Sequence, residues 1–242
     1  MKHRPFPGPE PKKEFPVHHT NVFKRQAYPR VDTLQRSDLH RELYRLYGKR
    51  CFDIVFCILS APIVVLVICL LACLVAATGQ SPFFTQERVG KDGRVFKMWK
   101  LRTMHPHDPH SLRDYLAQNP KARDEWRQNQ KLRHDPRVTT VGRFLRCTSL
   151  DELPQFVNVL RGEMSLVGPR PMLVSQRGLY QGDHYESLRP GISGNWQVSS
   201  RNRARFSERA VFDTQYFSTL SLSEDLRILK ATVGVVLRAT GC

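Results

Sequence analysis

Two neighbouring acids, Asp151 and Glu152, are the residues whose types and surroundings most directly suggest chemistry. They lie in CTSLDELPQFVNVLRGEMSLVGPRP, residues 147–171, in a chain with 38 Lys and Arg against 22 Asp and Glu. Four arginines flank the pair: Arg143, Arg146, Arg161 and Arg170. Nearby positive charge favours the carboxylate anion. An ionised aspartate can act as a nucleophile or as a ligand of Mg²⁺, so both roles are open for Asp151.

A structural role for these acids is the alternative. Ser149 to Glu152 fits the S-x-x-E pattern of a capping box, followed by an apolar run. Asp151 would then stabilise the first helical turn through the helix dipole. The two interpretations are compatible, because a helix start can also present Asp151 to a substrate.

Arg170 is the second candidate, because it stands between two prolines in the motif VGPRP. Two flanking prolines stiffen the backbone, and a guanidinium matches two phosphate oxygens at once. An ordinary surface arginine is the alternative interpretation. The pattern therefore indicates a phosphate contact without requiring one.

Two further stretches are rich in polar side chains. SSRNRARFSER contains Arg201 and Arg203 and fits a solvated basic loop, a contact with RNA or lipid headgroups, or a contact with a substrate phosphate. HPHDPH, residues 105–110, resembles a metal cluster, but its two prolines and its lack of helical spacing favour a solvated loop.

The composition limits the classes of partner that this chain is expected to bind. A net charge of +16 and a pI near 10.0 indicate anionic partners: nucleic acid, acidic lipids or phosphorylated substrates. The basic residues do not alternate with stacking aromatics, so we do not expect nucleic acid to be the partner. The six cysteines form no CxxC spacing, which predicts reduced thiols and no zinc site.

The N-terminal part divides into two segments. Residues 1–36 are basic and rich in proline, which predicts a disordered tail. Residues 37–80 combine an amphipathic lead-in with the uncharged apolar run 54–77. A straight helix over that run would be roughly 36 Å long, enough to cross a hydrocarbon core of about 30 Å. The run therefore predicts a membrane segment.

Two features weaken the prediction that this segment crosses the membrane. Pro62 would kink a helix, and Ser60 could help to satisfy the carbonyl groups that the kink frees. Basic residues also flank both ends of the run, whereas positive charge favours the cytoplasmic side. A segment that bends back satisfies this rule at both ends, so spanning and re-entrant arrangements both stay open.

Residues 81–242 read as one helix-rich α+β domain. An Asp-Gly turn at residues 91–93 predicts a small β-hairpin. Residues 111–132 suit an exposed helix, and residues 223–237 suit an amphipathic helix of the core. DPRVTTVGRFLR predicts a turn that enters a short helix, and residues 189–203 look like a loop.

Several motifs occur in one order over residues 48–238, chiefly ERVGKDGRVFKMWKLRTM, DPRVTTVGRFLRCTSLDELPQ, GEMSLVGPRP and RPGISGNWQV. Together they resemble the bacterial sugar transferases, which are monotopic polyprenol-phosphate phosphoglycosyl transferases. The resemblance is greatest to short members of the type that starts succinoglycan synthesis. It implies a re-entrant helix-break-helix in the membrane, joined to a cytosolic catalytic domain.

The resemblance also implies a reaction. Members transfer a hexose 1-phosphate from a UDP-sugar to undecaprenyl phosphate with Mg²⁺ and release UMP. It implies that Asp151 is the nucleophile and a metal ligand, and that Glu152 supports the metal or accepts a proton. Phosphate or substrate binding is expected of Arg146, Arg170, Arg201 and Arg203.

The resemblance places the chain at the inner membrane, with its catalytic domain facing the cytoplasm and in contact with membrane lipids. The sugar expected is galactose or glucose, with galactose favoured. A homo-oligomer stays open. The rival functions are a non-catalytic adaptor in polysaccharide assembly and a membrane-tethered nucleic-acid binder.

Overall fold

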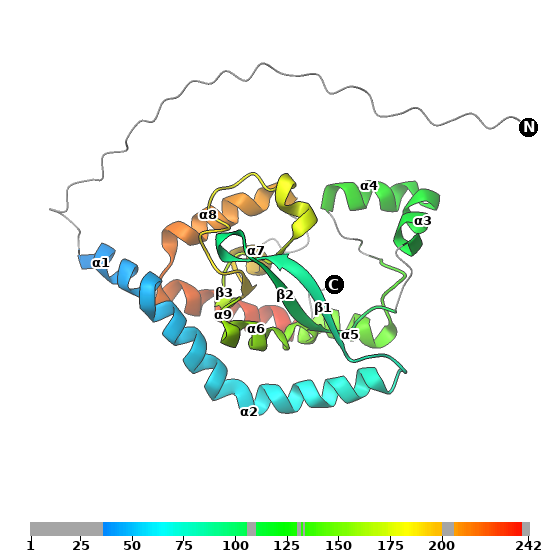
Figure 1. Ribbon diagram of the computed structural model, residues 1–242, viewed down its shortest axis with the longest axis horizontal. Helices are drawn as coiled ribbons and strands as arrows, with labels where there is room; N and C mark the ends of the chain where they lie inside the picture. The colour runs from blue at the N-terminus through cyan, green and yellow to red at the C-terminus, as the bar shows by residue number, and fades with distance from the viewer. Residues whose placement is uncertain (1–35, 106–109, 130–131, 133, 200–205, 239–242) are drawn as a thin grey trace, which may run out of the picture. The chain divides into compact units, whose positions relative to one another are not determined.

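The computed structural model describes residues 36–105, 110–129, 132, 134–199 and 206–238 (Figure 1). The helices are α1 (Arg36–Leu43), α2 (Lys49–Ala76), α3 (His110–Gln118), α4 (Pro120–Asn129), α5 (Thr140–Thr148), α6 (Gln155–Arg161), α7 (Asn195–Ser199), α8 (Arg209–Thr219) and α9 (Leu222–Leu237). The strands are β1 (Phe83–Val89), β2 (Val95–Leu101), β3 (Ser165–Val167), β4 (Met172–Leu173) and β5 (Gly191–Ser193). The helix-rich α+β class is as expected, and the predicted N-terminal tail lies outside the described residues.

The predicted hairpin is present and forms the larger sheet. β1 and β2 pair antiparallel from Phe83 opposite Leu101 to Val89 opposite Val95. The turn between them places Asp92 at a φ of 56°, a left-handed conformation that Asp tolerates. β4 pairs with the other edge of β1, with Arg88 opposite Leu173. This third strand, which the sequence pattern did not predict, brings the segment after Arg170 beside the hairpin.

A second, parallel pair joins β3 to β5, with Ser165 opposite Gly191. The prediction of a loop over residues 189–203 is therefore wrong for its first part, which contains β5 and α7. Both elements are too short for a periodic pattern to reveal them. The two backbones approach closely, because a Cβ atom on Gly168 would lie 2.3 Å from the carbonyl oxygen of Arg189.

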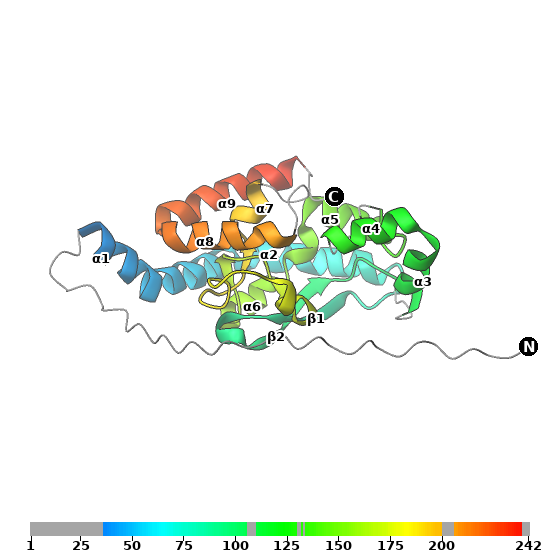
Figure 2. The same cartoon turned by 90° about the horizontal axis from the view of Figure 1, so that it is seen from above.

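The other helical predictions hold with adjusted boundaries. The exposed helix expected over residues 111–132 is two helices, α3 and α4, and α4 begins at Pro120, a favoured residue for a first helical turn. The predicted core helix is α9, whose Ile228 is completely buried. Figure 2 shows α8 and α9 on one side and the hairpin on the opposite side, and Figure 1 shows α2 running below these elements.

The long apolar helix α2 is continuous through Pro62, and it follows the π-helical turn η2 (Tyr44–Gly48). Figure 1 shows that α2 changes direction partway along its length. The Ser60 hydroxyl donates to the carbonyl oxygen of Phe56 at 2.7 Å. Its partner is therefore not Ile58, the residue whose carbonyl loses its helical donor at Pro62. Such back-bonding tends to bend helices, so Ser60 and Pro62 both favour the change of direction.

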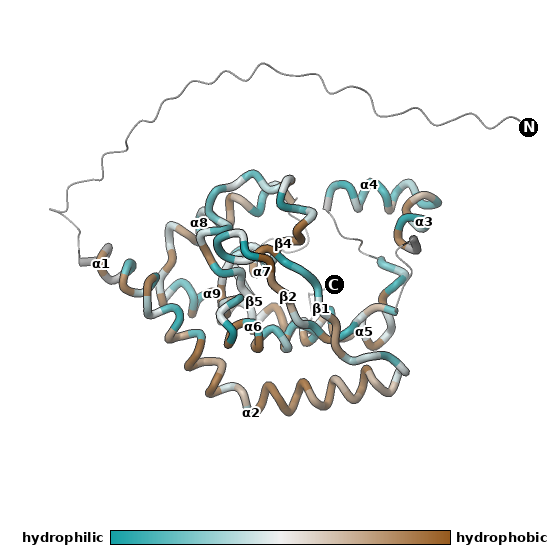
Figure 3. The backbone as a smooth tube through the Cα atoms, viewed as in Figure 1, coloured by the Kyte–Doolittle hydropathy of each residue, from teal (hydrophilic) through white to brown (hydrophobic). Residues whose placement is uncertain are grey.

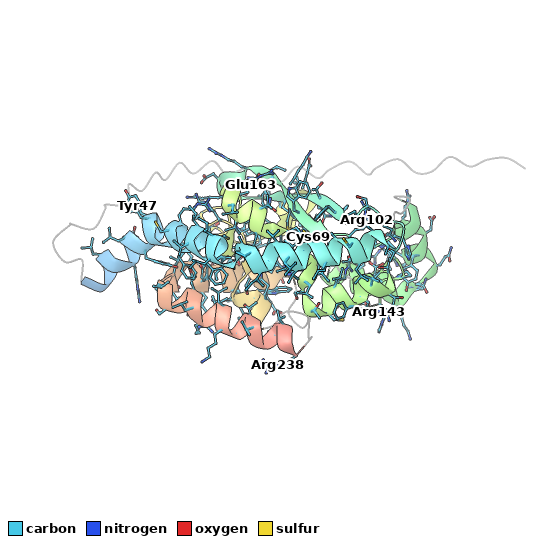
Figure 4. All side chains as sticks on the ribbon, turned by 90° about the horizontal axis from the view of Figure 1, so that it is seen from below. Tyr47, Cys69, Arg102, Arg143, Glu163 and Arg238 are labelled. Carbon is cyan, nitrogen blue, oxygen red and sulfur yellow. The ribbon has the colours of Figure 1, made fainter. Side chains whose placement is uncertain are left out.

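Both ends of α2 pack against the same domain. At its start, Arg50 donates to the carbonyl oxygen of Val159 at 2.6 Å, and the Asp53 carboxylate accepts from Ser165 Oγ and Leu166 N, each at 3.0 Å. At its end, the buried Val75 packs with Leu101 and Leu145. The helix therefore lies along the domain, and Figure 4 shows it crossing in front of the other elements, with Cys69 labelled on it.

The side of α2 that faces away from the domain is apolar. Among the described residues, Arg41–Ala76 is the one stretch long and apolar enough to cross a membrane, and only 6% of its most apolar window is buried. Figure 3 shows the apolar character of α2 against the largely hydrophilic α4. Its large exposed side chains include Leu59 at 75% and Ile63 at 70%. A core helix of a soluble domain would be covered, so this surface requires an apolar environment.

The cysteines differ from the expectation at one position. Cys51, Cys57, Cys69 and Cys73 are free thiols, as predicted for a reduced chain. Cys147, near the end of α5, forms a disulfide bond, so the prediction of reduced thiols is wrong for this residue. A sequence without CxxC spacings gives no signal for a bond between distant cysteines.

Candidate active site

A sharp turn between two short helices positions the acidic pair. The side chain of Thr139 accepts from Gly142 N at 2.8 Å and caps the start of α5. The helix ends at Ser149, which has a left-handed φ of 59°, and the 3₁₀ turn η4 (Leu150–Glu152) follows at once. The predicted capping box is wrong, because the Ser149 side chain does not cap this turn. Ser149 instead reverses the chain, so Asp151 turns inward.

Asp151 is buried in the domain, with 6% of its surface exposed. The Lys100 ammonium of β2 lies 3.6 Å from Asp151 Oδ2 and donates to Glu152 Oε1 at 2.7 Å. Among the described residues, none donates a hydrogen bond to the Asp151 carboxylate. Lys100 therefore joins the two acids, although adjacent helical residues do not share a face.

Lys100 is held in place through the backbone of β2. The buried Asn158 side chain of α6 accepts from Trp99 N at 3.0 Å and donates to the carbonyl oxygen of Lys97 at 2.8 Å. This clamp fixes β2 against α6 beside η4. A buried amide that satisfies backbone groups in this way costs free energy to disturb, so the position of Lys100 is well determined.

Burial dominates the electrostatics of Asp151. It raises the pKa of the Asp151 carboxyl above its usual value, and neighbouring Glu152 adds to the rise. The positive charges of Lys100, Arg146 and Arg170 lower that pKa but do not outweigh burial. The expectation that flanking arginines favour the anion was right about their sign. It is wrong about the net direction, because the sequence does not reveal burial.

Arg146 and Arg170 approach the acids from different elements. Arg146 Nε on α5 donates to Thr103 Oγ1 at 2.9 Å, and burial lowers the pKa of its guanidinium. Arg170 follows β3 and lies over the Trp196 ring, with 5.2 Å between its guanidinium carbon and the ring centroid. Both charges act on Asp151. The structure thus brings together the four site residues predicted from residues 146–170.

A small pocket opens beside the pair. It is lined by Arg88, Met98, Lys100, Glu152, Gln155, Arg170, Pro171, Gly191, Ile192 and Gln197. Most of its polar side chains are cationic or amide groups, which suits an anionic ligand. Arg201 and Arg203, also predicted to bind substrate, lie outside the described residues, as do residues 106–109 of the histidine stretch. Ser60 and Pro62 are on α2, away from this lining.

Sequence reasoning missed Lys100 and Arg88. Both lie on the predicted hairpin, where their charge suggested only a basic flank to the membrane segment. Lys100 precedes the buried Leu101, and Arg88 precedes the buried Val89, so strand alternation points both side chains away from those buried residues. That alternation was the available signal, but it did not show which strand edge would meet the acids.

Comparison with known proteins identifies the family. The bacterial sugar transferase family model matches residues 44–239. The chain is 44% identical over 195 residues to a UDP-galactose-lipid carrier transferase of Erwinia amylovora, covering 80% of this chain and 41% of that protein. It is 42% identical over 200 residues to exopolysaccharide production protein ExoY of Sinorhizobium fredii, covering 80% and 87%.

A third relative has a different sugar in its name. The chain is 37% identical over 196 residues to a UDP-glucose:undecaprenyl-phosphate glucose-1-phosphate transferase of Escherichia coli, covering 76% of this chain and 39% of that protein. The chain thus spans well under half of the Erwinia and Escherichia relatives but most of the rhizobial one. The family match over most of the chain confirms the resemblance found in its motifs: the chain belongs to the bacterial sugar transferase family.

Proposed function

We propose that this protein transfers a hexose 1-phosphate from a UDP-sugar to undecaprenyl phosphate, releases UMP and so starts exopolysaccharide synthesis. The names of its relatives support this reaction. The observation that carries the proposal is the state of Asp151. It is buried and beside a lysine, yet it accepts no hydrogen bond from the described residues. A buried carboxylate without hydrogen-bond donors lowers the stability of the fold. Groups in such an unfavourable state cluster at functional sites.

The reaction has two displacement steps at one phosphorus atom. A carboxylate oxygen of Asp151 attacks the sugar-side phosphorus of the UDP-sugar. The bond from that phosphorus to the bridging oxygen breaks, and UMP leaves with the electron pair. An oxygen of undecaprenyl phosphate then attacks the phospho-aspartyl phosphorus and displaces the carboxylate. The product is a lipid diphosphate sugar, and the kinetics are ping-pong.

The charged neighbours have distinct roles in this scheme. Arg146 and Arg170 balance the negative charge that spreads over the phosphoryl oxygens. Lys100 helps to keep Asp151 ionised, because it lowers the pKa of that carboxyl. Glu152 accepts a proton from the incoming lipid phosphate when that phosphate is protonated.

Mg²⁺ is the proposed cofactor, and the donor set fits it. Asp151 and Glu152 offer hard oxygen atoms, and Mg²⁺ is commonly held by one or two carboxylates together with substrate phosphates. A bound Mg²⁺ would neutralise phosphate charge. Among the described residues, no group of three or more His, Cys, Asp or Glu could hold a metal alone. The substrate phosphates would therefore complete the coordination.

The membrane arrangement we propose is re-entrant, with the domain on the cytoplasmic side of the inner membrane. α2 has 28 residues, so a straight helix would be about 42 Å long. Both of its ends pack on one domain, and its exposed side is apolar. A spanning helix would carry one end across the bilayer, away from that domain. Insertion of the bent helix from one side keeps both ends and Asp151 on that side, near the lipid phosphate.

Cysteine labelling tests this arrangement. Tyr47→Cys and Gln80→Cys, each in a background with Cys51, Cys69 and Cys73 changed to Ser, report the two ends of α2. A membrane-impermeant maleimide added to spheroplasts should label neither site, and both should react after permeabilisation. Pro62→Ala should straighten α2 and expose the earlier site in part of the population. Labelling of one end before permeabilisation, with Pro62 intact, would show a spanning helix.

The reaction is tested with the purified full chain in detergent. UDP-galactose and UDP-glucose are each supplied with undecaprenyl phosphate and Mg²⁺, and both UMP and the lipid-linked sugar phosphate are measured. We expect UMP and the lipid-linked sugar phosphate to form in equal amounts. We also expect UDP-galactose to react faster than UDP-glucose. A protein that gives neither product but retains tight, salt-sensitive polynucleotide binding would be a nucleic-acid binder, and one that does neither would be an adaptor.

A further inference from the structure

The guanidiniums of Arg88 and Arg170 line the pocket, and a third, that of Arg209, shares the Trp196 indole with Arg170. The Arg170 guanidinium carbon lies 5.2 Å from the Trp196 ring centroid, and that of Arg209 lies 4.8 Å from it. Arg209 also lies 4.6 Å from the Phe206 ring centroid. Arg88 of β1 donates to the carbonyl oxygen of Pro171 at 3.1 Å, directly after Arg170. Residues from β1, α7 and α8 therefore meet at Arg170.

Nearby acids balance only a part of the positive charge of this cluster: Glu152 acts to raise the pKa of Arg88, and Asp213 acts to raise that of Arg209. None of the three guanidiniums forms an ion pair with a carboxylate of the described residues. Burial lowers the pKa of Arg88 and of Arg209, and the charge of Arg170 lowers both further. Like charges are held together only when something offsets their repulsion. Trp196 offsets a part of it through its ring face.

Buried polar groups around the cluster lack partners. Arg88 Nε and Arg209 Nε, although buried, donate to no acceptor among the described residues. Gln197 is 8% exposed and lines the pocket, and both atoms of its amide are unpaired. Buried donors without acceptors destabilise the folded chain. An anionic ligand in the pocket would supply oxygen acceptors for these donors.

The cluster adjoins the acidic pair but is not centred on it. Glu152 acts electrostatically on Arg88, and Arg170 acts on Asp151, which links the two groups of charges. The pKa of Arg209 is instead influenced by the charges of Arg170, Asp213 and Arg88. A phosphate attacked by Asp151 would lie near Lys100 and Arg146, so Arg88 and Arg209 are available for a neighbouring phosphate.

We propose that Arg88 and Arg209, with Gln197, form a second phosphate-binding subsite beside Asp151, and that Arg170 lies between this subsite and the phosphate that Asp151 attacks. The subsite holds a phosphate group other than the one that Asp151 attacks. Two groups in the proposed reaction have this chemistry: the nucleotide phosphate that leaves as UMP, and the phosphate of the lipid acceptor. The inference rests on the proposed function for its ligands, but anion binding by the subsite can be measured without turnover.

The first experiment measures binding alone. Inorganic pyrophosphate and UMP are each titrated into the full chain in detergent, and the affinity of each is measured by calorimetry. Loss of a charged hydrogen bond costs about 1.5–3 kcal/mol, so Arg88→Gln and Arg209→Gln should each weaken binding of at least one ligand by roughly 10-fold to 100-fold. Arg177→Gln is the matched control, because Arg177 is exposed and paired with Glu186 at 2.8 Å. It should bind both ligands normally.

The second experiment distinguishes the two phosphate sources. Exchange of labelled UMP into UDP-sugar without lipid reports the first displacement, and the KM for undecaprenyl phosphate reports the second. If Arg209→Gln lowers UMP affinity and slows exchange, the subsite holds the nucleotide phosphate. If pyrophosphate binding falls and only the lipid KM rises, it holds the lipid phosphate. Unchanged binding together with normal kinetics in both steps would overturn the subsite.

Two further comparisons protect this test. Arg88→Lys and Arg209→Lys keep the charge, so they should recover part of the lost affinity if an anion is bound. They also replace the Gln variants should those fail to fold, as judged by thermal unfolding. A wild-type chain that binds pyrophosphate through these arginines but shows neither exchange nor transfer would retain the subsite and refute the proposed reaction.

Discussion

Two buried aspartates, Asp151 and Asp225, each lie beside a lysine but have opposite surroundings. Asp225 is completely buried and accepts from Tyr44 OH at 2.6 Å, Tyr216 OH at 2.6 Å and Lys49 Nζ at 2.8 Å. Asp151 has Lys100 at 3.6 Å and no hydrogen bond from the described residues. The first carboxylate is fully engaged, whereas the second is free to accept a new partner.

This difference in donors distinguishes a carboxylate that anchors the fold, Asp225, from one that can react, Asp151. The donors of Asp225 come from η2, α2 and α8, so this carboxylate ties the membrane helix to the domain. A buried charge with several donors in place stabilises one arrangement of the chain and is a poor nucleophile. Asp151 keeps its oxygen atoms available at the cost of a raised pKa. Residues in such an unfavourable state cluster at functional sites.

Asp→Asn at both positions tests this contrast. The largest expected effect is the loss of activity at Asp151. Asp151→Asn removes the nucleophilic oxygen without changing the size of the side chain. We expect UMP release and sugar-phosphate transfer to fall by at least about 10³-fold. The thermal unfolding temperature should be unchanged or slightly higher, because Asn lacks the charge that is penalised in this buried position. Near-normal turnover in this variant would refute the assignment of the nucleophile.

Asp225→Asn should show the reverse pattern. It leaves the Lys49 ammonium, whose side chain is 11% exposed, without its counter-charge. Breaking a buried pair in this way costs about 3–5 kcal/mol of unfolding free energy. Denaturant unfolding in detergent measures this loss, with Glu42→Gln of the exposed 4.0 Å pair with Arg45 as control. The folded fraction should retain normal activity, and a selective loss of activity would mean that Asp225 also takes part in the reaction.

Lys100→Met tests how the neighbouring positive charge acts on Asp151. Asp151 attacks as the anion, so activity falls as the pH drops through its pKa. Burial raises that pKa and Lys100 lowers it, so removal of the ammonium raises it further. The acid limb of the kcat/KM profile should move to higher pH, and the maximal rate should fall by roughly 10²-fold.

Lys97→Met is the matched control for Lys100, because Lys97 is exposed on the same strand and three residues away. Its profile should follow that of the wild type. An unshifted acid limb in Lys100→Met would show that Lys100 contributes position rather than charge.

The sequence predicted those parts of the fold that carry local signals. The hairpin has its Asp-Gly turn, α9 has its apolar stripe, and α5 has the preceding turn at residues 135–138. β4 and β5 were missed, because strands of two or three residues have no usable period and owe their pairing to distant partners. Ser149 was assigned to a cap from its pattern, whereas its left-handed φ follows from how α5 and η4 meet.

The site was predictable only along the segment that contains the acids. Asp151, Glu152, Arg146 and Arg170 lie within one run of sequence that carries family motifs. Lys100 and Arg88 come from the hairpin, and Arg209 comes from α8. Only the tertiary fold brings the first two beside Glu152 and the third beside Arg170. The net direction of the Asp151 pKa depends on burial, which charge counting along the chain does not give.

A third buried aspartate, Asp53, is intermediate between the other two in its number of hydrogen-bond donors. The prediction made from it has the smallest expected effect. Its carboxylate accepts from Ser165 Oγ and Leu166 N, each at 3.0 Å, so it has fewer donors than Asp225 and more than Asp151. Ser165→Ala removes one of the two donors and should cost about 1.5–3 kcal/mol of unfolding free energy. Ser218→Ala, which removes an exposed bond to the carbonyl oxygen of Gln215, should cost much less. If donors mark anchors, Ser165→Ala must leave kcat/KM unchanged; a loss of activity without a loss of stability would mean that hydrogen bonding does not separate anchoring carboxylates from the reactive one.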